Sequence, residues 1–135
     1  MVDLALLVLR LVLGIIFVAH GAQKLFGSFG GPGLKGTADF FEQLGIRPAY
    51  PMAVAVGAIE FVGGILSVLG FLTPVAAVGL IAVMIGAILT VHLRHGFFAQ
   101  SGGYEFNLAL IGMALALLLA GAGSYSLDAA LGLFW

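Results

Sequence analysis

Four long apolar stretches, separated by polar or glycine- and proline-rich segments, constrain this chain more than any other feature. They cover approximately residues 4–25, 50–71, 73–93 and 104–121. A helix of about 20 apolar residues crosses a hydrocarbon core about 30 Å thick. Because 62% of the residues are hydrophobic and only 8% are charged, the chain cannot cover a soluble globule with polar side chains. We therefore predict an all-α fold in which residues 1–135 form one domain, a polytopic membrane four-helix bundle in contact with the lipid bilayer.

The connections between the stretches predict how the helices follow one another. Residues 70–74 are too few for anything except a tight hairpin, so the second and third helices should be antiparallel neighbours. In the first connection, Asp39 and Glu42 have the spacing of a capping box, and Gly45 suits a helix end. We expect a short helix there, which lies in the membrane interface, packs on the end of the bundle, or does both.

Composition also limits the partners and the chemistry. A net charge of −1 gives no basic surface for nucleic acid. No cysteine is present, so thiol chemistry and iron–sulfur ligation are excluded for this chain.

Four spans place both termini on one side of the membrane. The longer loops carry Lys24, Lys35, Arg47 and Arg94, which predicts by the positive-inside rule that the termini face outward.

Arg10 and Glu60 are charged residues inside predicted spans. Such residues cost roughly 2.5–3.5 kcal/mol each on insertion and usually face partners in the bundle interior. Counted at about 1.5 Å per residue from the side of the longer loops, Arg10 is about 21 Å deep and Glu60 about 15 Å deep. We expect them to form an intramembrane ion pair, which either fixes helix docking or serves in ligand or proton handling.

Two stripes of small residues follow the helical period of the second and third helices. The stripe around Glu60 contains Gly57, Gly64 and Ser67. The other stripe contains Gly79, Gly86 and Thr90. Small residues let helices approach closely in lipid, so both stripes favour tight packing over a channel, within the chain or in a homo-oligomer.

A second set of polar residues gathers where the longer loops meet the bundle. On the first helix, His20, Gln23 and Lys24 share one face because of their i, i+3 and i+4 spacing. His92 ends the third helix, and Tyr104, Glu105 and Asn107 open the fourth helix at nearly the same depth. We therefore expect the polar residues of these three helices to lie in one layer. The candidate ligand-binding residues are His20, Gln23, Lys24, His92, Tyr104, Glu105 and Asn107.

Several chemistries fit this layer. A quinone head group needs hydrogen-bond donors near the interface while its tail lies among apolar helices. The two histidines could ligate haem or a metal with Glu105, but metal-binding spacing of the HExxH kind is absent, so both are disfavoured. The layer could instead be a satisfied polar cap on the bundle. No motif for hydrolysis or nucleotide binding occurs, and no catalytic residue is assigned.

Short motifs, in order along nearly the whole chain, resemble the DoxX family of prokaryotic membrane proteins. They are His20–Gly27, Gly30–Gly33, Glu60–Gly64, His92–Phe98, Gly102–Glu105 and Tyr125–Asp128. The chain departs from the family at residue 122, where alanine replaces a common proline.

This resemblance implies a four-helix, multi-pass protein of the bacterial plasma membrane. The family is named for similarity to a subunit associated with archaeal terminal quinol oxidase and thiosulfate:quinone oxidoreductase. Relatives are linked to redox and oxidative-stress functions, sometimes in complexes with soluble redox enzymes. We therefore expect an accessory or quinone-binding component of a membrane redox system. A binding or transport module for a lipid or small hydrophobic solute, and a non-catalytic assembly scaffold, are the alternatives.

Overall fold

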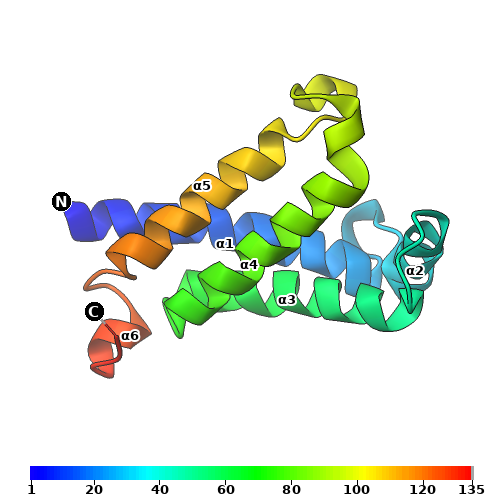
Figure 1. Ribbon diagram of the computed structural model, residues 1–135. Helices are drawn as coiled ribbons and strands as arrows, with labels where there is room; N and C mark the ends of the chain where they lie inside the picture. The colour runs from blue at the N-terminus through cyan, green and yellow to red at the C-terminus, as the bar shows by residue number, and fades with distance from the viewer. Residues whose placement is uncertain (135) are drawn as a thin grey trace.

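The computed structural model describes residues 1–134, and these fold entirely as helices and their connections. The long helices are α1 (Val2–Phe26), α3 (Ala49–Leu69), α4 (Thr73–Ala87) and α5 (Glu105–Ala120). Two shorter helices are α2 (Gly33–Gln43) and α6 (Leu127–Ala130). Figure 1 shows the four long helices gathered in one bundle, with α2 at one end and α6 at the other. The predicted all-α bundle is confirmed.

The lengths of the helices decide which of them satisfy the requirement for a membrane span. Three are long and apolar enough: Val2–Phe26, Ala49–Leu69 and Thr73–His95. The last of these is α4 with the π-helical turn Ile88–His92 and the 3₁₀ turn Leu93–His95 that continue it. The fourth predicted span is represented by α5, which is apolar but has 16 residues, about 24 Å of helix.

The helix in the first connection exists, but its predicted start is wrong. α2 begins at Gly33, directly after Pro32, so Asp39 lies inside the helix and caps nothing. It ends near Gly45, whose positive φ of 80° is readily adopted by glycine. Phe41 and Ala38 are buried against Ala53 of α3, so α2 packs on the end of the bundle. Its placement in the membrane interface stays a prediction.

Glycines set the close contact between α1 and α3. A Cβ at Gly14 would lie 2.6 Å from the carbonyl oxygen of Gly64, and one at Gly21 would overlap the backbone of Phe61. Small residues therefore bring these two helices together, as the first stripe predicted. The resulting alignment places Leu25 beside Gly57, whose added Cβ would lie 2.7 Å from Leu25 Cδ2.

The apolar core lies where α1, α4 and α5 meet. Its buried members are Leu13, Phe17, Ala77, Leu80, Met84, Leu110, Ala114 and Leu117.

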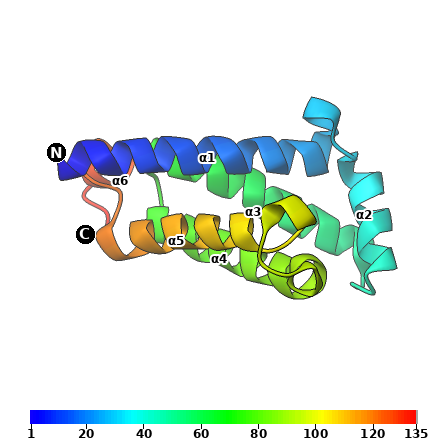
Figure 2. The same cartoon turned by 90° about the horizontal axis from the view of Figure 1, so that it is seen from above.

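Both ends of the described chain lie at the same end of the bundle (Figure 2). At this end the backbone N–H of Ser124 donates to Asp3 Oδ1 at 3.0 Å. The predicted α3–α4 hairpin is present, with Pro74 in the first turn of α4.

A polar clamp, formed by Arg10, Asp128 and their backbone partners, fastens the C-terminal segment to this end. The Arg10 guanidinium, fully buried, donates to the Tyr125 carbonyl at 2.6 Å and to the Val68 carbonyl at 3.4 Å. The Asp128 carboxylate accepts from the backbone N–H groups of Leu72 (2.8 Å), the residue before α4, and Thr73 (3.0 Å), its first residue. α6 thereby caps the α3–α4 hairpin.

Candidate functional site: an amphipathic cavity at the open end of the bundle

A cavity of about 1100 Å³ lies at the end of the bundle opposite the termini. Its walls come from α1, α2, α3, α4 with its π-helical turn, and the start of α5. Figure 1 shows why space remains there: α4 and α5 diverge from α1 and α3 toward the loop that joins them. Most of the lining is aliphatic or aromatic. The polar side chains in the walls are His20, Gln23, Lys24, Thr37, Glu60, Thr90, His92 and Asn107.

Lys24 and Glu60 form an ion pair in the cavity wall. Lys24 Nζ lies 2.5 Å from Glu60 Oε1 and donates a hydrogen bond to Oε2 at 3.2 Å. The carboxylate is only 1% exposed, whereas the lysine side chain is 26% exposed. Glu60 is therefore held in the bundle, and the lysine is the more accessible partner.

The predicted pair between Arg10 and Glu60 is wrong. Arg10 donates to backbone carbonyls at the terminal end, and Glu60 pairs with Lys24. The error came from the register of α1 against α3. Leu25 lies beside Gly57 rather than level with residue 50, an offset of about 10 Å along the helices.

Histidine and amide side chains from three helices complete the polar wall. The His20 ring lies 6.0 Å from the Phe106 ring, between their centroids, which links α1 to α5. His92 Nδ1 lies 2.8 Å from the Gly102 carbonyl oxygen, and a hydrogen bond there would make Nδ1 the donor. Asn107 is buried, and its Nδ2 contacts Met84 Sδ at 3.5 Å. Gln23 Nε2 donates to the Phe29 carbonyl at 3.4 Å.

Two of the predicted site residues do not line this cavity. Glu105 Oε1 accepts from the backbone N–H of Ala99 at 3.0 Å, and the Tyr104 ring packs edge-on against Phe97 at 5.5 Å between centroids. Both therefore organise the loop before α5. The other five predicted ligand-binding residues lie in the walls: His20, Gln23, Lys24, His92 and Asn107. Whether they bind a ligand stays a prediction.

Sequence reasoning did not include three residues of the polar wall in the predicted ligand-binding layer: Glu60, Thr37 and Thr90. Glu60 was assigned to a different partner, and Thr37 lies on a helix whose start was misplaced. Thr90 belongs to the stripe expected to pack tightly, yet a Cβ at Gly86 would meet nothing within 4 Å, and both residues line the cavity. Within this stripe, Gly79 fits the expectation of tight packing, because a Cβ added there would lie 3.3 Å from Ile59 Cγ2.

His20 and His92 line the same cavity, as a haem or metal site would require. Among residues 1–134, however, no three histidine, aspartate or glutamate side chains gather closely enough to hold a metal ion. The donor set therefore gives no positive support for a metal centre.

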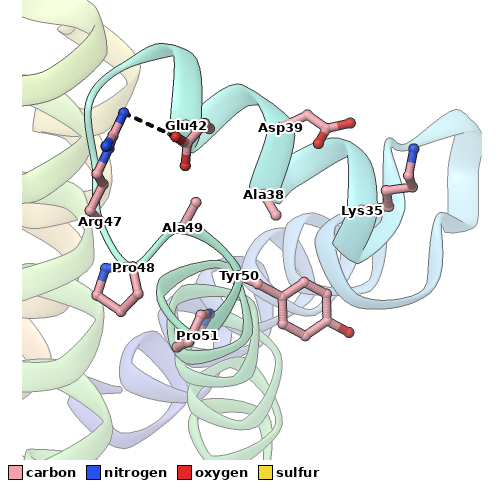
Figure 3. Close-up of a pocket in the computed structure, with 9 residues that line it drawn as sticks. All are labelled: Lys35, Ala38, Asp39, Glu42, Arg47, Pro48, Ala49, Tyr50 and Pro51. Atoms are coloured by element: carbon pink, nitrogen blue, oxygen red, sulfur yellow. Dashed lines mark ion pairs between the residues drawn. The ribbon is translucent and has the colours of Figure 1, made fainter.

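A second depression, about 530 Å³ and open, lies outside the bundle where α2 leads into α3 (Figure 3). Arg47 and Glu42 pair across it at 3.0 Å, with Arg47 72% and Glu42 54% exposed. Exposed pairs of this kind contribute about 0.2–1 kcal/mol. This pair supplies an exposed counterpart to the buried Lys24–Glu60 pair.

The fold defines a helical-bundle membrane protein with an amphipathic cavity at one end. The chain belongs to the DoxX family, whose sequence model matches residues 5–93. It is 36% identical over 126 residues to the Bacillus subtilis (strain 168) protein named "Putative oxidoreductase CatD", covering 93% of this chain and 86% of that protein.

Further relatives carry names that state only a location. The chain is 35% identical to "Uncharacterized membrane protein Rv3486" of Mycobacterium tuberculosis, covering 89% of this chain and 77% of the relative. It is 30% identical to "Inner membrane protein YqjF" of Escherichia coli (strain K12), covering 98% and 96%. No solved structure matches this chain significantly.

Proposed function

We propose that the cavity binds a quinone-type head group, and that the protein is an accessory component of a redox system in the prokaryotic plasma membrane. The observation that carries this proposal is the Lys24–Glu60 ion pair, with a buried carboxylate and a partly exposed lysine, in the wall of a mostly apolar cavity. Ligand sites combine such apolar walls with a few convergent polar groups. The name of the Bacillus subtilis relative supports the redox class.

The chemistry of the wall suits a ring with two carbonyl oxygens. Lys24 Nζ already contacts Glu60 and, being partly exposed, can donate to a carbonyl of the ring. Glu60 can accept from a hydroxyl of the reduced ring, and Asn107 can donate or accept. Electrons would come from a partner enzyme, because the chain has neither cysteine nor a redox cofactor motif.

A module for binding or transporting another lipid or hydrophobic solute is the second candidate. The size of the cavity favours it, since about 1100 Å³ exceeds the usual range of roughly 300–1,000 Å³ for small-molecule sites. The sequence predicts a pair of Arg10 and Glu60 that could handle such a ligand. Arg10 is instead fully buried in the clamp, so only Glu60 remains available to such a ligand.

Replacing Glu60 by glutamine tests the proposal. The change keeps the shape of the side chain but removes the charge that positions Lys24. A hydrogen bond to a charged group is worth about 1.5–3 kcal/mol, so we expect binding of menadione, a tail-less naphthoquinone, to weaken by about 10- to 150-fold. The measurement is the menadione-induced rise in unfolding temperature of the detergent-purified protein, titrated to give Kd.

Glu42→Gln is the matched control, because it removes the same charge from the exposed pair with Arg47 and should leave Kd unchanged. Equal affinity of Glu60→Gln and the original protein would remove Glu60 from the site. If the original protein does not bind menadione but is stabilised by a phospholipid or fatty acid, the second candidate replaces the first. Stabilisation by no small molecule would favour the assembly scaffold.

A further inference from the structure

We propose that the cavity has a lateral portal between α3 and α4, through which the ligand enters from the lipid and where its hydrocarbon tail remains. This inference rests on the proposed function, and it specifies the ligand as a single-tailed amphiphile. The portal is defined by Ala55 and Ile59 on α3 and by Ala82 and Gly86 on α4, all of which line the cavity.

The first support is that glycines mark close contact between α3 and α4 at Gly63 and Gly79 but not at Gly86, which lies farther from the connecting turn. A Cβ at Gly63 would lie 3.0 Å from Leu80 Cδ2, and one at Gly79 would lie 3.3 Å from Ile59 Cγ2. Seven residues further along α4, about 10 Å, a Cβ at Gly86 would meet nothing within 4 Å. The two helices visibly diverge in this direction in Figure 1.

The second support is that the residues bordering the portal are exposed rather than buried between the helices. Ile59 is 39% exposed, and Ala55, Ala82 and Gly86 are exposed as well. These positions lie within Ala49–Leu69 and Thr73–His95, two of the helices apolar and long enough to span a membrane. The outer edge of the cavity therefore faces acyl chains, and small side chains border it on both helices.

The third support is the position of the ion pair relative to this opening. Glu60 follows Ile59 directly, so about 100° of helix rotation separates the buried carboxylate from the exposed edge of the portal. A head group at Lys24 and Glu60 would thus have its tail directed outward between α3 and α4. The remaining volume of the cavity can hold the first part of such a tail, because one aromatic ring fills only a fraction of about 1100 Å³.

A compound without a tail does not occupy the portal. A head group bound at Lys24 and Glu60 leaves the space between α3 and α4 empty when it carries no tail, whereas the tail of a longer ligand must fill that space. Narrowing the portal should therefore weaken the binding of tailed ligands and leave the binding of tail-less ligands nearly unchanged.

The test is Gly86→Leu, which fills the portal without touching Lys24 or Glu60. The added side chain enters open space, and leucine favours a helix more than glycine does. Gly112→Leu is the matched control, because Gly112 is exposed on α5, an added Cβ there also meets nothing within 4 Å, and it does not line the cavity. Ala55→Phe narrows the portal from the opposite helix.

Binding of menaquinone-4 and of tail-less menadione is compared by ligand-induced thermal stabilisation of each purified variant. We expect Gly86→Leu and Ala55→Phe to weaken menaquinone-4 binding by about tenfold or more, with menadione binding within about twofold of the original. Gly112→Leu should match the original protein for both ligands. Unchanged menaquinone-4 binding in both portal variants would overturn the portal while leaving the proposed head-group site intact. Failure of the original protein to bind either quinone would overturn both.

Discussion

Replacing Gly21 by leucine is expected to prevent assembly of the folded bundle. A Cβ at this position overlaps the backbone nitrogen, Cα and Cβ of Phe61, and backbone cannot move aside as a flexible side chain can. Overpacking usually costs about 1–3 kcal/mol, and we expect a larger loss here because α1 and α3 must separate along their whole contact. That separation would also break the Lys24–Glu60 pair, since the two residues lie on these helices.

The measurement is the apparent free energy of unfolding in mixed micelles, titrated with a denaturing detergent, together with the yield of monodisperse protein. Gly112→Leu again provides the control, with an expected change of at most about 0.5 kcal/mol. Gly21→Ala is a milder second variant, because alanine adds only the Cβ that overlaps Phe61 and lacks the rest of the leucine side chain. A Gly21→Leu protein as stable as the control would show that α1 and α3 are not held together at Gly21.

Asp128→Ala is expected to destabilise the protein by about 3–5 kcal/mol. The buried carboxylate, 3% exposed, accepts from the backbone N–H groups of Leu72, just before α4, and of Thr73, its first residue, and both would lose their partner. A negative charge at a helix N-terminus is also favoured by the helix dipole. The same change releases α6, and with it the Tyr125 carbonyl that accepts from Arg10.

Asp128→Asn keeps one acceptor oxygen and should give an intermediate loss. Asp39→Ala is the control, since Asp39 is an exposed aspartate on α2 and its removal should change stability by at most about 0.5 kcal/mol. Unfolding is followed as for the glycine variants. Equal stabilities of the Asp128 and Asp39 variants would show that the polar clamp does not hold the terminal end together. Neither Asp128 variant touches the cavity, so menadione affinity per folded molecule should be retained.

The clamp also explains a motif that sequence comparison alone left without a role. Residues Tyr125–Asp128 resembled the family pattern, and they are the residues that meet Arg10 and the start of α4. Ser126 caps the N-terminus of α6, with its hydroxyl oxygen accepting from the Ala129 N–H at 3.1 Å. The contacts of this segment assign Arg10 to bundle assembly.

The candidate site was partly visible in the sequence. The spacing of His20, Gln23 and Lys24 predicts a shared helix face, and all three line the cavity. The depth of His92 and Asn107 in the membrane, counted along their helices, also predicted that they lie near these three residues. Tyr104 and Glu105 were included by the same argument of depth, but the loop before α5 uses both for its own contacts. Depth predicts the layer of a residue and leaves its direction open.

The sequence by itself determined the class of protein, the all-α fold, the positions of the apolar helices and the α3–α4 hairpin. These features depend on local hydropathy, helix length and turn length, all of which are written along the chain. Only the tertiary structure decided that Glu60 pairs with Lys24, that Arg10 joins the C-terminal clamp, and that Gly86 borders a cavity. Those outcomes depend on the register at which glycines let α1 and α3 touch and on the angle at which α4 leaves α3. Close backbone contact between distant segments sets both quantities, and no local pattern encodes them.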